Sequence, residues 1–148
     1  LGYTLAFGLL GLAALPVLVR PNGRIVWPLA AAGVLAVVVL ALGTIGWAGA
    51  DFSMPTLMGG TALVCPWLII LTAVPLLAVM LRGMRSFAPR SPAMAGFAAG
   101  LVSGGFGAAA YAFYCGETSM MFIGVWYTIG IGLTALLGAV LGRFVLRW

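Results

Sequence analysis

The chain contains no histidine and no lysine, and only two of its 148 residues are acidic, Asp51 and Glu117. The absence of histidine excludes haem ligation through imidazole, histidine zinc sites and histidine general bases. The two carboxylates lie on different predicted loops, without a visible partner for general acid–base catalysis. No ionisable carboxylate or base lies in the middle of an apolar stretch, where a charge costs at least about 2.5–3.5 kcal/mol. The sequence therefore argues against a proton-coupled transporter, a pump or an ion channel with a charged filter.

Polar residues are also too few to cover the surface of a soluble domain. The chain is 64% hydrophobic and 6% charged, with a mean hydropathy of +1.23, so lipid must be its solvent. Apolar runs such as residues 34–42 and 63–71 are unbroken, unlike the alternating strands of a membrane β-barrel. We therefore predict an all-α fold, a polytopic transmembrane helical bundle.

Charge-free stretches of sufficient length predict the individual spans. A span needs about 20 predominantly apolar residues to cross the hydrocarbon core. The five stretches that qualify are residues 1–19, 26–48, 60–81, 92–114 and 119–142. We predict that residues 1–148 form a single transmembrane domain.

The arginines indicate an orientation for these spans. They follow the first span, separate the third from the fourth and follow the fifth: Arg20, Arg24, Arg82, Arg85, Arg90, Arg143 and Arg147. With five spans, all seven fall on one side and both acidic residues on the other, so the positive-inside rule places the C-terminus in the cytoplasm. We read the net charge of +5 as a topology signal and expect no direct nucleic-acid binding. An outside start without a signal peptide predicts one further upstream span, so we expect six helices in full, with an N-terminal cytoplasmic segment and first helix outside this sequence.

Small residues recur at four-residue intervals in the last two predicted spans. One set is Gly96, Gly100, Gly104 and Ala108, and the other is Gly130, Thr134, Gly138 and Gly142. Such spacing puts small residues on one helix face and lets two backbones approach closely. We therefore predict tightly packed helices in this half of the chain.

The two cysteines lie at a similar predicted depth. Cys65 is near the outer end of the third span and Cys115 is at the outer end of the fourth, a layer that in bacteria is oxidising enough for a disulfide. Thiolates and thioethers suit Cu(I) and other thiophilic metals. Candidate auxiliary soft ligands at the same depth are Met54, Met58, Met120 and Met121. A structural disulfide or inert packing of the cysteines, and ordinary apolar roles for the methionines, stay open as alternatives.

Four short motifs, in their order along the chain, resemble the NrsF family of membrane-integral anti-sigma factors. They are Cys65-Pro66-Trp67, Cys115-Gly116-Glu117, Trp126-Tyr127, and Gly142-Arg143 with Leu146-Arg147-Trp148. The resemblance implies a six-helix bacterial inner-membrane protein whose N-terminal cytoplasmic segment, outside this sequence, holds an extracytoplasmic-function sigma factor inactive. It also implies that heavy metals or oxidants release that factor, and that Cys65 and Cys115 are the sensing pair.

These observations predict a sensor and regulator, not an enzyme. Disulfide formation, or capture of a soft metal ion such as copper or cadmium, would draw two span ends together, because disulfide-bonded Cα atoms lie about 4.4–6.8 Å apart. No resident cofactor is required. The third and fourth spans share a candidate cytoplasmic docking loop that carries Arg82, Arg85 and Arg90.

Three other functions stay open from the residues alone. A small transporter or channel for a neutral or metal substrate would need a hydrated path that these uncharged spans do not indicate. A quinone-linked thiol oxidoreductase would need a redox-active cysteine pair, and the chain has no Cys-x-x-Cys motif. An assembly subunit of a larger complex is the third alternative.

Overall fold

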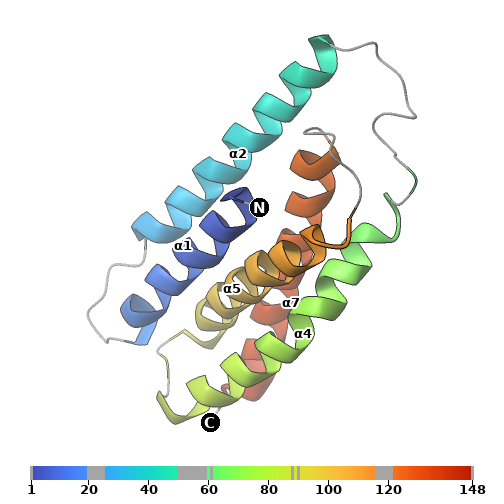
Figure 1. The fold of residues 1–148 in the computed structure, drawn as a ribbon. Coiled ribbons are helices and arrows are strands. Elements are labelled where there is room, and N and C mark those ends of the chain that lie inside the picture. The colour runs from blue at the N-terminus through green and yellow to red at the C-terminus, as the bar shows by residue number, and fades with distance from the viewer. Residues whose placement is uncertain are drawn as a thin grey trace.

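The computed structural model describes residues 2–19, 26–49, 60, 62–87, 89, 91–115 and 122–147. The long helices of these residues form one bundle (Figure 1) and are α1 (Gly2–Val19), α2 (Val26–Gly49), α4 (Cys65–Met84), α5 (Pro92–Ala112) and α7 (Thr128–Val145). A 3₁₀ turn, η1 (Arg85–Phe87), follows α4, and a π-helical segment, η2 (Ile123–Tyr127), leads into α7. The described residues contain no strand, so the all-α prediction is confirmed.

Three segments are long and apolar enough to cross a membrane: Cys65–Phe87, Pro92–Ala112 and Ile123–Val145. Helices α1 and α2 are also apolar and free of charged residues over their 18 and 24 residues. Large apolar side chains cover the outer surface of the described helices, as at Val37, Leu71 and Leu136. Such a surface suits hydrocarbon as its solvent. The expected sixth helix stays a prediction.

Helix ends differ in places from the ends of the charge-free stretches. Helix α4 begins at Cys65 rather than at residue 60, because residues 62–64 form a turn and Pro66 occupies the first helical turn, where proline is favoured. At the other end α4 continues past Arg82, and α7 continues past Arg143. A long arginine side chain near a helix end reaches the polar interface without ending the helix.

Helix α5 lies at the centre of the bundle and packs against α1, α4 and α7. Its face toward α7 is built from glycines in antiparallel register. A Cβ atom at Gly96 would lie 2.1 Å from the carbonyl oxygen of Gly138, and one at Gly138 would lie 2.3 Å from that of Gly96. A Cβ at Gly100 would lie 2.6 Å from the Cα of Ala135. The predicted close packing is therefore confirmed as direct backbone contact, although Gly130 faces Ile69 of α4 instead.

The other two faces of α5 also use glycine. A Cβ at Gly105 would lie 2.5 Å from the backbone nitrogen of Gly8 on α1. A Cβ at Gly107 would lie 2.9 Å from the Cβ of Ala73 on α4, and the Thr72 hydroxyl lies 3.1 Å from the Gly107 carbonyl oxygen. Neighbours on all three sides therefore contact the α5 backbone itself.

The alternating helix directions give the bundle two distinct ends. Cys65 at the start of α4, Ala112 at the end of α5 and the η2 segment lie at one end, because α4 and α7 both run antiparallel to α5. The end of α4, the start of α5 and the end of α7 lie at the other (Figure 1). A structural change at one end can therefore affect the other end only through movement of the helices.

Replacing Gly96 by alanine tests the backbone contact between α5 and α7. Because the added methyl would meet the Gly138 carbonyl oxygen, we expect Gly96→Ala to lower the free energy of unfolding by roughly 1–3 kcal/mol. Denaturant unfolding in detergent micelles measures the loss. Gly132→Ala on α7 is the matched control, because nothing lies within 4 Å of the added atom. Equal stability of the two variants would contradict the proposed backbone contact between α5 and α7.

Candidate functional site

Cys65 is buried where the start of α4 meets the end of α5. Its side chain is 0% exposed, and its Sγ lies 3.2 Å from the hydroxyl oxygen of Tyr111. Tyr111 belongs to the last turn of α5, and the antiparallel packing of the two helices brings the phenol over the first residue of α4. Either the thiol or the phenol can be the donor in this contact.

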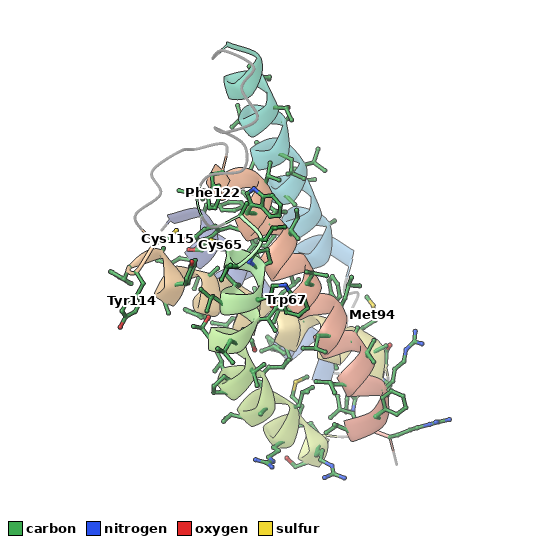
Figure 2. The ribbon with its side chains drawn as sticks, turned by 90° about the vertical axis from the view of Figure 1, so that its right-hand side faces the viewer. Cys65, Trp67, Met94, Tyr114, Cys115 and Phe122 are labelled. Carbon is green, nitrogen blue, oxygen red and sulfur yellow. The ribbon has the colours of Figure 1, made fainter. Side chains whose placement is uncertain are left out.

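Cys115 joins the same group of side chains from just beyond the end of α5. Its backbone N–H donates to the Tyr111 carbonyl oxygen at 3.0 Å, so it continues the helical turn that begins at Tyr111. The Cys115 thiol lies close enough to the hydroxyl groups of Tyr111 and Tyr127 to influence both electrostatically. Figure 2 shows Cys65 and Cys115 at the same end of the bundle. We call Cys65, Tyr111, Cys115 and Tyr127 the thiol–phenol cluster.

Apolar side chains enclose this cluster unevenly. Phe122 and Tyr127 are 0% and 2% exposed and pack in the same core as Cys65. The rings of Tyr111 and Tyr127 lie 6.1 Å apart between centroids, tilted by 42°. Cys115 is only half-buried and packs at the edge of this core. Within the cluster, Cys65 is therefore fully buried, whereas Cys115 is partly exposed.

No disulfide joins Cys65 and Cys115. Within the described part of the chain, no group of three or more histidine, cysteine, aspartate or glutamate side chains could hold a metal ion. The cluster can therefore lose two electrons to form a disulfide, or offer two thiolates to a soft metal ion.

The η2 segment connects the cluster to α1. The hydroxyl of Thr128 donates to the Gly124 carbonyl oxygen, inside the π-helical turn that ends at Tyr127. Because this bond uses the only hydroxyl hydrogen of Thr128, the Tyr3 hydroxyl on α1 must donate to the Thr128 oxygen, 2.5 Å away. Tyr127 is the last residue of η2, and Tyr3 bonds to the residue that follows it. Such π-helical turns are frequent at functional sites.

The remaining predicted residues divide into two groups. Arg82 and Arg85 are exposed at the end of the bundle opposite the cysteines, where Arg143 and Arg147 line a hollow beside the start of α5. Several of the residues singled out from the sequence lie outside the described residues: Arg20, Arg24, Asp51, Met54, Met58, Arg90, Glu117, Met120 and Met121. What the sequence predicts for those residues stays a prediction.

Sequence reasoning missed the two tyrosines as members of the site. Tyr111 precedes Cys115 by four residues, which is one helical turn, so their common face could have been found from spacing alone. Tyr127 forms part of a motif that carries the family resemblance, but only the packing of η2 against α4, with the Tyr127 ring beside that of Tyr111, brings it to the thiols. Predicting its place in the site would have required knowing which helices pack against each other.

The fold and the site define an all-α bundle, with three helices long and apolar enough to span a membrane and two thiols at one end. The chain belongs to the NrsF family, whose model, described as negative regulator of sigma F, matches residues 1–148. No solved structure matches it.

Two relatives illustrate the similarity. A protein of Azospira oryzae named probable anti-sigma-F factor NrsF is 39% identical over 131 residues, which cover 87% of this chain. The protein of Caulobacter vibrioides named anti-sigma-F factor NrsF is 35% identical over 149 aligned residues, which cover 99% of this chain. The aligned regions span 62% and 70% of these two relatives, respectively.

Replacing Thr128 by valine tests the link between η2 and α1. The substitution keeps the shape but leaves the Gly124 carbonyl and the Tyr3 hydroxyl without this partner, so we expect a loss of about 1–3 kcal/mol in the free energy of unfolding. We also expect faster amide hydrogen exchange in η2. Thr44→Val on the exposed side of α2, where the hydroxyl bonds only to Ala41 of its own helix, is the control. Similar exchange in both variants would contradict the link.

Proposed function

We propose that this protein is a membrane-integral anti-sigma factor that holds a sigma factor inactive in the cytoplasm. Heavy-metal or oxidative stress, sensed by Cys65 and Cys115, releases the factor. The main support is the pair of thiols, not joined by a disulfide, beside Tyr111 in a chain of the family described as negative regulator of sigma F. Family membership favours this regulator over a transporter, a channel or a quinone-linked oxidoreductase. The sigma factor is of the extracytoplasmic-function type.

The thiol pair faces the periplasm and the arginines face the cytoplasm of a bacterial inner membrane. Support for this orientation comes from the charges: the four described arginines lie at the end of the bundle opposite the thiol–phenol cluster. Positively charged loops are retained in the cytoplasm during insertion. A stress agent in the envelope therefore reaches the cysteines without crossing the bilayer.

Reaction of the thiols changes how α4 packs against α5. A disulfide requires an S–S distance of about 2.05 Å, and therefore pulls the start of α4 toward the end of α5. Helix α5 also contacts the backbone of α1 at Gly105, so a shift of α5 alters the N-terminal part of the bundle. Such coupling requires that the bundle has two packing arrangements, and that events at either end of the bundle change the balance between them.

The sigma factor binds mainly through an N-terminal cytoplasmic segment outside this sequence. The loop between α4 and α5 is a second docking candidate, because Arg82 and Arg85 are exposed there and Arg90 follows in sequence. No resident cofactor takes part. A soft metal ion such as copper or cadmium acts as a transient signal, held by the two thiolates.

Cysteine substitution tests the sensing role. In a host that makes the full-length protein, its sigma factor and a sigma-dependent reporter, we expect Cys65→Ser and Cys115→Ser to keep repression without stress. Induction by hydrogen peroxide or cadmium should fall to the uninduced level, because one sulfur can neither close a disulfide nor complete a two-thiolate site. Membrane abundance by immunoblot controls for insertion. Normal induction in both variants would refute the sensing role.

The orientation has its own test. A membrane-impermeant thiol reagent, added to cells with a permeabilised outer membrane, should label Cys115, because this side chain is half-buried rather than enclosed. Cys115→Ser is the control, since the buried Cys65 should label little. Labelling of Cys115 only after the inner membrane is opened would reverse the proposed sidedness.

A further inference from the structure

We propose that the two thiols have different roles during oxidation and that Tyr111 relays the proton between them. Cys115 reacts first with a hydroperoxide, and Cys65 then resolves the oxidised Cys115 to a disulfide. This inference rests on the proposed function only in taking the thiol pair as the sensing site.

The order of reaction follows from the unequal burial of the two sulfurs. Cys65 is 0% exposed and packs in one core with Phe122 and Tyr127, whereas Cys115 is half-buried at the edge of that core. An oxidant arriving from outside the bundle therefore meets Cys115 first. Reactivity of a cysteine follows its exposure as well as its thiolate character.

The first step consumes the peroxide. The Cys115 sulfur attacks one peroxide oxygen, the O–O bond breaks, and Cys115 becomes a sulfenic acid while one water or alcohol leaves. The sulfur loses two electrons, which the peroxide gains. This step needs access to Cys115 alone.

The second step joins the two cysteines. The Cys65 sulfur attacks the Cys115 sulfur, the S–S bond forms and the S–O bond of the sulfenic acid breaks. The Cys65 thiol loses a proton and the departing hydroxide gains one, so one water is released in this step. Two thiols have then been oxidised by one peroxide.

Tyr111 is placed to carry this proton. Its hydroxyl lies 3.2 Å from the Cys65 sulfur and within electrostatic range of the Cys115 thiol. The Cys115 backbone N–H also donates to the Tyr111 carbonyl oxygen at 3.0 Å, which keeps the two residues one helical turn apart. A hydroxyl can accept one hydrogen bond while it donates another. It can therefore take the proton of Cys65 and give its own to the hydroxide that leaves Cys115, ending unchanged. Because Cys65 is wholly buried, this phenol supplies a path that bulk water does not.

Replacing Tyr111 by phenylalanine removes the relay and keeps the ring. In purified full-length protein in lipid nanodiscs, treated with hydrogen peroxide, we expect Tyr111→Phe to slow disulfide formation by at least about tenfold. Sulfenic acid on Cys115, trapped by dimedone and located by mass spectrometry, should accumulate at the wild-type initial rate. Tyr114→Phe is the matched control, because that phenol lies one residue before Cys115 but is 89% exposed.

Two cysteine variants check the assigned order. Cys65→Ser should retain a stable sulfenic acid on Cys115, and Cys115→Ser should leave Cys65 unmodified on the same time scale. Sulfenic acid on Cys65, or equal disulfide rates in the Tyr111→Phe and Tyr114→Phe proteins, would overturn the proposal. Slower sulfenic acid formation in Tyr111→Phe would also overturn it, since the phenol would then act on the first step. The assay contains no sigma factor, so its outcome is independent of the transcriptional test.

Discussion

Direct backbone contact between α5 and α7 is the constraint on which the bundle depends. Between membrane helices in general, no hydrophobic force drives association, so close van der Waals contact supplies the packing energy. The glycine face that meets Gly138 provides such contact, and Gly105 and Gly107 extend it to α1 and α4. Because three helices touch the α5 backbone, their ends come together around the last turn of α5. That turn carries Tyr111 and leads to Cys115.

The thiol–phenol cluster therefore lies where several helices end, rather than along one helix. Cys65 comes from α4, Tyr111 from α5 and Tyr127 from η2. A covalent change between the two sulfurs acts on the contact between α4 and α5, whose backbones are already in contact at Gly107. Tightly packed helices respond to such a change by moving as rigid bodies, because a close-packed interior deforms little. Under the proposed function, the packing that builds the site also transmits its changes.

Local patterns made the helices, the small-residue faces and the depth of both cysteines predictable from the sequence, because hydropathy and four-residue spacing act within one helix. The start of α4 was missed because apolar residues continue through the turn before Cys65. Tyr127 was missed because its place beside Cys115 depends on how η2 packs against two other helices. The hydrogen bond from Tyr3 to Thr128 joins residues 125 positions apart and has no local signal.

The position of the thiols within an apolar core explains why phenols accompany them. A polar group buried away from water costs free energy unless it has a partner, and a phenol offers both a donor and an acceptor on a large apolar ring. Tyr111 thus lets a thiol lie among apolar side chains while keeping one hydrogen bond to it. The described arginines lie at the opposite end of the bundle, far from this chemistry along the helices. Any signal between the two ends must therefore pass through helix packing, for which α5 provides the central path.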